Sequence, residues 1–264
     1  MNMRGRLKFL SENSEPPYFG PSEGGADARS TLVGDFEMRD VEILDGRLLD
    51  EDLSLDTHGF ELRSLSGVGD LYDSETIADR HEPQCRELVA SVTGATRVHI
   101  FDHTWRSDAA DTRGQHGSRE PSSFVHNDYT PWSAPKRVVD ILGEEGERLA
   151  RNDFAIVNVW RPIATVYSSP VAVCDARSVS PESLVAAERR GKGRIGEVYV
   201  ARYDPHQRWI YFPQMTPDEV LLIKTFDSRE DGRARWCVHT AVEETGDTGN
   251  PPRESMETRL FAFL

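Results

Sequence analysis

The stretch from Asp153 to Ile163 reads DFAIVNVWRPI, in which polar residues are set among β-branched and aromatic ones. Such side chains favour a pleated strand, so this stretch predicts a β-strand. Segments of similar character occur on both sides of it. The further predicted strands are Arg97–Phe101, Phe124–Tyr129, Pro170–Cys174, Val198–Tyr203, Arg208–Phe212, Glu219–Phe226, Ala234–Val242 and Met256–Leu264.

Helical patterns and turn signals flank these strands. The predicted helices are residues 74–93 with Ser74 as the capping residue, residues 133–151, and a helix that begins at Ser180-Pro181-Glu182. Residues 106–122 are polar and contain glycine, which predicts a loop. Asp45-Gly46 is a turn signal between two short alternating segments and predicts a hairpin.

This order of elements predicts a mainly β protein with flanking helices (α+β), namely a double-stranded β-helix, or jelly roll, of the cupin-like kind. Opposed strands of such a fold close into a barrel whose mouth can hold a ligand. The competing architecture is a doubly wound α/β sheet, which requires a strict alternation of strands and helices that residues 195–264 lack. The 264 residues show no break in composition, so we expect a single domain over residues 1–264.

Composition excludes several classes of partner. The formal net charge is −14, which is unfavourable for binding nucleic acid or an anionic membrane through general electrostatics. No segment approaches the roughly 20 apolar residues of a membrane span. Cys85, Cys174 and Cys237 are far apart and form no CxxC motif, so we expect reduced thiols and a cytoplasmic location.

His126-Asn127-Asp128 is the only His-x-Asp triplet in a chain with eight histidines. Positions i and i+2 of a strand face the same side, so His126 and Asp128 can reach one ion while Asn127 points away. His239, in the predicted strand 234–242, is the expected third ligand. Two imidazoles and one carboxylate on one face of Fe(II) leave coordination positions for a co-substrate and O2. A triplet alone is a weak signal, and a lone strand histidine is more often structural.

Arg253 follows His239 and begins the last predicted strand, with Ser255 on the same face. A planar guanidinium matches a carboxylate, and a hydroxyl two residues on adds a second donor. We therefore expect Arg253 and Ser255 to bind the far carboxylate of a 2-oxo acid. Arg259, on the same face, is the alternative, and Arg253 could instead pair with Glu254 or Glu257.

Other candidates surround these residues. Asn158 and Trp160 share one face of the strand 153–163, where Asn158 is expected to bind the co-substrate or substrate and Trp160 to form a wall of the pocket. Arg161 on the other face and Tyr129 just after the metal pair are further candidates for substrate contact. The structural alternatives are that Trp160 belongs to the core and that Arg161 forms a salt bridge.

Several segments resemble those of a known family in the same order. They are HNDYT (126–130), NVWRP (158–162), CDARSV (174–179), YFPQMTPDEV (211–220), KTFDS (224–228) and PRESMETR (252–259). Together they resemble the CmcJ/AsaB-like hydroxylase and desaturase family, which includes fungal gibberellin desaturase-like and cephalosporin hydroxylase-like tailoring enzymes. The resemblance covers about residues 85–264, the expected catalytic core, and leaves residues 1–60 as a less similar N-terminal extension.

The family is regarded as Fe(II)/2-oxoglutarate-dependent oxygenases of specialised metabolism. The resemblance implies iron at His126, Asp128 and His239, and 2-oxoglutarate at Arg253 with Ser255. We therefore expect a dioxygenase that uses O2 to hydroxylate or desaturate a small-molecule intermediate of natural-product biosynthesis. Two alternatives stay open, a cupin-like metalloenzyme that does not use 2-oxoglutarate and a metal-free jelly-roll binding module.

Overall fold

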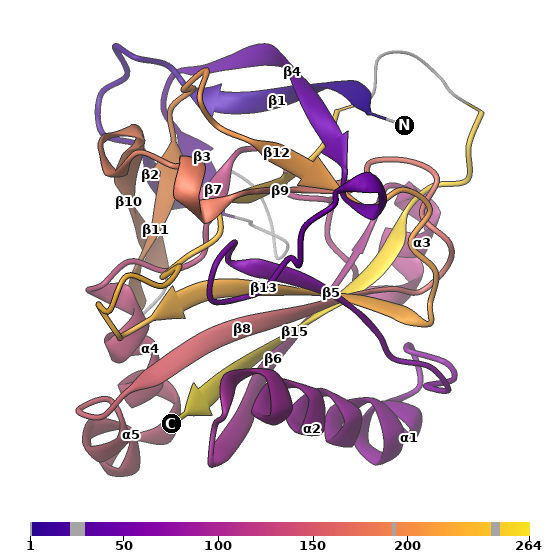
Figure 1. Ribbon diagram of the computed structural model, residues 1–264, viewed down its shortest axis with the longest axis vertical. Coiled ribbons are helices and arrows are strands. Elements are labelled where there is room, and N and C mark those ends of the chain that lie inside the picture. Colours follow the sequence, from indigo (N-terminus) through magenta and orange to yellow (C-terminus); the bar gives the residue numbers. More distant parts are fainter. Residues whose placement is uncertain (1, 22–29, 192–193, 244–248) are drawn as a thin grey trace.

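Two β-sheets face each other in the computed structural model, which describes residues 2–21, 30–191, 194–243 and 249–264 (Figure 1). Within this part of the chain the larger sheet has the order β1 (Met3–Leu10), β4 (Phe36–Asp45), β12 (Trp209–Tyr211), β9 (Val171–Cys174), β14 (His239–Ala241), β7 (His126–Asn127), β11 (Arg194–Ala201), β10 (Leu184–Gly191), β2 (Tyr18–Pro21) and β3 (Ser30–Val33). The smaller sheet has the order β5 (Phe60–Ser64), β13 (Glu219–Asp227), β8 (Phe154–Pro162), β15 (Glu254–Phe263) and β6 (Arg97–Ser107).

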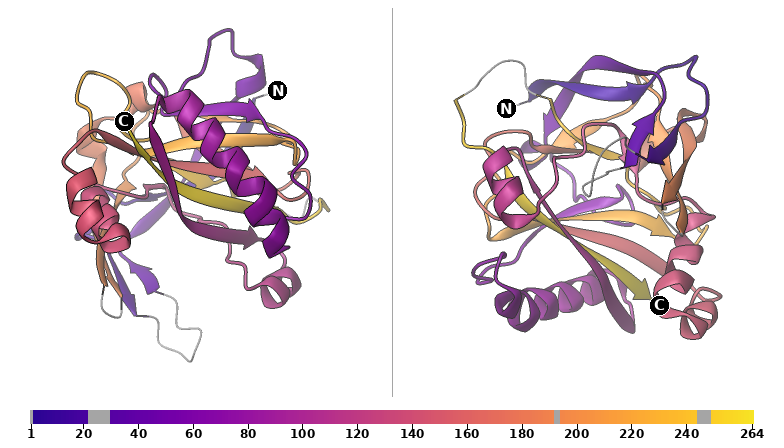
Figure 2. Two further views of the ribbon diagram at one scale, coloured as in Figure 1. Left: turned by 90° about the horizontal axis from the view of Figure 1, so that it is seen from below. Right: turned by 180° about the vertical axis from the view of Figure 1, so that it is seen from behind.

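Strand β8 is the centre of the smaller sheet. It pairs antiparallel with β13 on one side and with β15 on the other, and every one of its residues is buried. Its outward residues Ala155, Val157 and Val159 pack beneath α2 (Glu82–Thr93), which crosses the outer face of this sheet (Figure 2). The opposite face of β8 is turned towards the larger sheet, so apolar residues occupy both faces of the strand.

A core of apolar side chains lies between the two sheets. Its members come from both sheets and from the segments that join them, and they are Phe60, Trp160, Val166, Val173, Ile210, Phe212, Met215, Leu221, Ile223 and Cys237. A further cluster covers the end of this space, where Ala134 and Val138 of α4 (Ser133–Leu142) meet Phe154 and Phe261 of the smaller sheet. Burial of these side chains holds the sheets at a fixed separation.

The predicted hairpin at Asp45-Gly46 is wrong. Strand β4 already pairs with β1 on one edge and with β12 on the other, so the chain leaves the sheet after Asp45. A 3-10 turn, Gly46–Leu48, follows, in which the Asp45 carboxylate accepts a hydrogen bond from the backbone N–H of Arg47. The next strand, β5, then pairs with β13 in the smaller sheet.

The first two predicted helical regions exist with different details. Residues 74–93 contain α1 (Ser74–Thr76), a π-helical turn (Ile77–His81) and α2, and the capping residue is Asp73 rather than Ser74. Residues 133–151 contain α4 and α5 (Glu144–Leu149), which are separated at Gly143. The glycine adopts a φ of 58°, which ends the first helix.

Two further elements differ from the expectation. The helix predicted to begin at Ser180 is a 3-10 turn, Pro181–Ser183, followed by β10, which forms an antiparallel hairpin with β11. Cross-strand pairing overrides the helical preference of its alanine and arginine residues. The loop predicted over residues 106–122 contains α3 (Ala110–His116), and the preceding strand β6 extends to Ser107. No helix in the described part of the chain is long and apolar enough to cross a membrane.

Gly59 provides a test of how tightly the sheets are joined. Its φ is 83°, and a Cβ atom added there would lie 2.9 Å from Cβ of Cys237 and 3.0 Å from the carbonyl oxygen of Trp236. We expect Gly59→Ala to lower the free energy of unfolding by about 1–3 kcal/mol more than Gly67→Ala does. Alanine is strained by the positive φ at both positions, but only at Gly59 does its Cβ also meet neighbouring atoms. Urea denaturation of the two variants measures this, and equal losses would contradict the close approach.

Candidate metal centre

The two histidines of the predicted site lie directly opposite each other. Strands β7 and β14 are antiparallel neighbours in the larger sheet, and His126 is paired in register with His239. The centroids of the two imidazole rings are 4.5 Å apart. Cross-strand pairing thus brings together two residues that are far apart in the sequence.

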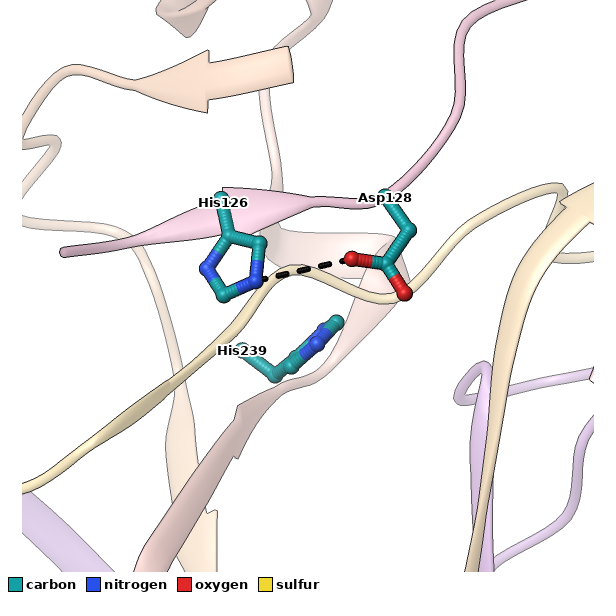
Figure 3. Close-up of side chains that lie close together, drawn as sticks. All are labelled: His126, Asp128 and His239. Atoms are coloured by element: carbon teal, nitrogen blue, oxygen red, sulfur yellow. Dashed lines mark ion pairs between the residues drawn. The ribbon is translucent and has the colours of Figure 1, made fainter. Parts of the chain in front are cut away.

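Asp128 completes the group (Figure 3). It follows His126 by two residues and turns its carboxylate towards the imidazoles, with Oδ1 lying 3.6 Å from Nε2 of His126. The possible ligand atoms of His126, Asp128 and His239 all lie within 4.8 Å of one another. The three residues predicted from the sequence therefore converge on one point.

Each imidazole is oriented by the backbone two residues before it. Nδ1 of His126 lies 2.8 Å from the carbonyl oxygen of Phe124, and Nδ1 of His239 lies 2.9 Å from that of Cys237. A carbonyl can only accept, so both Nδ1 atoms donate, and Nε2 is the atom of each neutral ring that can bind a metal. Burial and the neighbouring His239 lower the pKa of His126 to about 3, so this ring is neutral at pH 7 and suited to metal ligation.

The carboxylate of Asp128 is fixed through one of its oxygens. Oδ2 accepts a hydrogen bond of 2.8 Å from Nδ2 of Asn158 and one of 3.3 Å from Nε of Arg259. Burial would raise the pKa of Asp128, but the charge of Arg259, helped by the hydrogen bond from Asn158, outweighs it and lowers the pKa far below its ordinary value. The aspartate is therefore ionised, with Oδ1 facing the histidines.

Asn158 and Arg259 act as a pair. They are cross-strand neighbours on β8 and β15, so a single register places both side chains against Asp128. Arg259 also binds the carboxylates of Asp102, at 2.5 Å, and of Glu257. The structure thus gives Asn158 a contact with a proposed metal ligand, whereas the sequence had suggested a contact with the co-substrate or substrate.

Arg253 and Ser255 lie on the same inward face, just before and within β15. Arg253 is 2% exposed, its guanidinium lies 5.6 Å from the ring centroid of Trp160, and its Nη1 donates to the carbonyl of Ser169 at 2.6 Å. Burial lowers its pKa to about 10, so it stays charged at neutral pH. Nε of Arg253 and Oγ of Ser255 are buried and have no hydrogen-bond partner among the described residues.

Two cavities share His126 in their lining. A small inner cavity of about 20 Å³ is also lined by His239, Trp160 and Arg253 among others. An outer cavity of about 720 Å³ is also lined by Asp128. Each residue of the triad consequently borders at least one of the two cavities.

The remaining predicted residues, Tyr129 and Arg161, lie in different places, one in the outer cavity and one on the outer face of the smaller sheet. Tyr129 lines the outer cavity. Arg161 points to the outer side of β8, where it binds the backbone carbonyls of Pro217 and Leu65. That position lies beneath the sheet rather than in either cavity.

Four arginines of the outer cavity were missed, namely Arg106, Arg119, Arg137 and Arg189. They come from β6, the segment after α3, α4 and β10, and no regular spacing in the sequence relates them. The segment after α3 had been assigned to a loop and β10 to a helix, so no periodicity could have brought the four together.

Comparisons with known proteins identify the family. A family model described as Oxidoreductase/YMDC permease-like domain matches residues 7–263. The hydroxylase/desaturase CTB9 of Cercospora beticola is 36% identical over 259 residues, covering 86% of this chain and 77% of that protein. This chain belongs to the same hydroxylase/desaturase family. The predicted family is thereby confirmed.

Other members of this family carry more specific names. The alpha-ketoglutarate-dependent dioxygenase phiK of a fungal species, strain ATCC 74256, is 30% identical over 261 residues, covering 94% of each chain. A solved structure of the iron and alpha-ketoglutarate-dependent endoperoxidase NvfI matches with a TM-score of 0.82 at 26% identity, covering 100% of this chain and 98% of that one. The predictions of a jelly roll and of an Fe(II)/2-oxoglutarate-dependent oxygenase family are thus confirmed.

Arg259 should contribute more to stability than a surface arginine does. Arg259→Gln would leave the carboxylates of Asp102, Glu257 and Asp128 without their shared cation, so we expect the free energy of unfolding to fall by about 3 kcal/mol or more. Arg97→Gln is the control, because Arg97 pairs with Glu145 at the surface and its loss should have little effect. Urea denaturation at pH 7 measures both, and equal losses would contradict the role given to Arg259.

Proposed function

We propose that this chain is an Fe(II)/2-oxoglutarate-dependent oxygenase that hydroxylates or desaturates a small-molecule intermediate of specialised metabolism, with iron held by His126, Asp128 and His239. The observation that carries the proposal is the convergence of two Nε2 atoms and one carboxylate within 4.8 Å. The other polar atoms of these side chains are occupied by hydrogen bonds, which leaves the ligand atoms free. Three protein ligands on one face of the metal leave positions for a co-substrate and O2.

The far carboxylate of 2-oxoglutarate is proposed to bind Arg253 and Ser255. Both residues present a buried donor without a partner in the described chain, which is the polarity that a carboxylate would satisfy. Arg259 is already engaged by Asp102, Asp128 and Glu257, so it is poorly suited to the same task. The inner cavity is narrow, and its lining side chains must therefore shift when a dicarboxylate enters.

The bound iron and co-substrate supply the oxidation of a C–H bond by O2, with conversion of 2-oxoglutarate into succinate and CO2. The residues of the chain position the reactants. Asn158 and Arg259 hold Asp128, while Trp160 packs beneath Arg253 and helps to exclude water from the inner cavity. The substrate would enter through the outer cavity, in which Tyr129 is a candidate contact.

A reducing compartment such as the cytoplasm suits this proposal. Cys85, Cys174 and Cys237 are buried and free of disulfide bonds. Burial raises the pKa of Cys85 and of Cys174 to about 12, so these thiols are protonated at neutral pH. Iron must also stay in the Fe(II) state for the proposed reaction.

Loss of any one ligand should abolish iron binding and turnover. We expect the variants His126→Ala, Asp128→Ala and His239→Ala to hold far less than one iron per chain. The iron is measured after anaerobic incubation with Fe(II) and removal of the unbound metal. His206→Ala is the control, because that imidazole is 87% exposed and lies in a turn away from the site. Metal analysis measures the bound iron, and full iron content in any of the three variants would refute the ligand assignment.

Arg253→Gln should raise the 2-oxoglutarate requirement. Removal of a charge-assisted interaction with a carboxylate predicts a rise of about 10–100-fold in the concentration that gives half-maximal succinate formation. Ser255→Ala should have a smaller effect in the same direction, since it removes a neutral donor. Succinate is quantified at increasing 2-oxoglutarate, and an unchanged requirement in Arg253→Gln would assign the co-substrate to another residue. Absence of succinate from the unsubstituted chain would favour a metalloenzyme that does not use 2-oxoglutarate.

A further inference from the structure

The outer cavity contains arginines that have no carboxylate partner. Arg106, Arg119 and Arg189 line it, and none of them forms an ion pair with a carboxylate in the described part of the chain. The chain as a whole has a net charge of −14, so basic side chains without an acidic partner are unexpected around one cavity. Unpaired guanidinium groups around a cavity are suited to an anionic ligand.

The carboxylates of the same cavity form no ion pair with these arginines in the described part of the chain. Asp102 and Asp128 pair with Arg259, Asp140 with Lys136 and Glu120 with Arg113, while Glu197 accepts a hydrogen bond from Thr130. The charge of Asp128 acts on Arg106 and Arg189 only from a distance, so most of the positive charge remains available to a ligand.

The arrangement of the backbone brings like charges together. Arg119 and Arg106 face each other in an isolated β-bridge, and the backbone N–H of Arg119 donates to the carbonyl of Trp105 at 2.8 Å. Arg189 lies on β10 and lines the same cavity, close enough for the charge of Arg119 to act on it. Mutual repulsion of this kind is relieved by a bound anion.

An aromatic wall connects these cations to the proposed metal ligands. The guanidinium of Arg189 lies 5.8 Å from the ring centroid of Phe19. The ring of Phe19 lies 5.9 Å from that of Phe124, which in turn lies 4.7 Å from the imidazole of His126. The lining of the cavity thus passes in space from the charged Arg189, over the apolar rings of Phe19 and Phe124, to the proposed metal ligand His126.

We propose that the substrate is an apolar acid whose carboxylate is bound by Arg119 and Arg189, with its apolar skeleton against Phe19 and Phe124. Arg106 contributes positive charge between this anion and the metal ligands. The reacting C–H bond would then lie at the end of the skeleton remote from the carboxylate. This inference rests on the proposed function for the identity of the reactive end, whereas the anion site rests on the arginines alone.

The test compares two probes that differ in charge and have the same skeleton, 1-naphthoate and 1-naphthamide. Their affinities for the full chain are measured by calorimetry under nitrogen, with Fe(II) and saturating 2-oxoglutarate present. We expect 1-naphthoate to bind about tenfold more tightly, and its advantage to shrink as the salt concentration rises. The double variant Arg119→Gln/Arg189→Gln should lose this preference and retain its affinity for the amide. Arg151→Gln, an exposed arginine outside the cavity, is the control and should keep the preference.

Several outcomes would overturn the proposal. Equal affinity for the two probes in the unsubstituted chain would do so, as would a preference that survives in the glutamine double variant. If the glutamine double variant binds neither probe, the double variant Arg119→Lys/Arg189→Lys is measured instead. It keeps both positive charges, so loss of its preference for 1-naphthoate over 1-naphthamide would contradict the proposal. Displacement of 2-oxoglutarate by 1-naphthoate would place the anion at the metal instead. The absorption band of the Fe(II)–2-oxoglutarate complex is recorded first, and its absence would refute the proposed function independently of the probes.

Discussion

The carboxylate of Asp128 joins the candidate metal centre to the fold. It belongs to the segment that follows β7 of the larger sheet, whereas its partners Asn158 and Arg259 belong to neighbouring strands of the smaller sheet. An isolated carboxylate would be costly to bury between two sheets, and a guanidinium and an amide on one oxygen offset that cost. Because both partners bind Oδ2, the interaction that joins the sheets also determines which oxygen faces the imidazoles.

The register of β15 decides which side chains enter the space between the sheets. Ser255, Glu257 and Arg259 face inward, whereas Thr258 faces the outer helical layer, where its Oγ1 lies 2.8 Å from Nε2 of His81 in the π-helical turn before α2. Side chains alternate along a strand, so a slip of one residue would turn Thr258 towards Asp128 and bury Arg259 beneath the helix. The apolar contacts between α2 and the outer face of the sheet therefore stabilise the site from a distance.

Ligand chemistry located the site in the sequence more than hydrophobic periodicity did. Strands β7 and β14 have only two and three residues, too few for an alternating apolar pattern. Residue type, residue order and the two-residue period of a strand identified His126, Asp128 and His239. Asn158 was placed on the correct face, but its contact with Asp128 was missed because the sequence does not reveal which segment lies opposite. Strand β10 was mistaken for a helix for the same reason, since its pairing with β11 decides its conformation.

Two sets of guanidinium groups lie beside the metal ligands, and they differ in burial. Arg253 is 2% exposed and packs on Trp160, so a carboxylate bound there would be shielded from water and salt. Arg119 and Arg189 are exposed, so an anion held between them remains subject to screening. Buried charge gives a strong contact with one fixed geometry, which suits a co-substrate of constant shape. Exposed charge gives a weaker and more adaptable contact, which suits an outer ligand whose reacting carbon must still be aligned by the apolar wall.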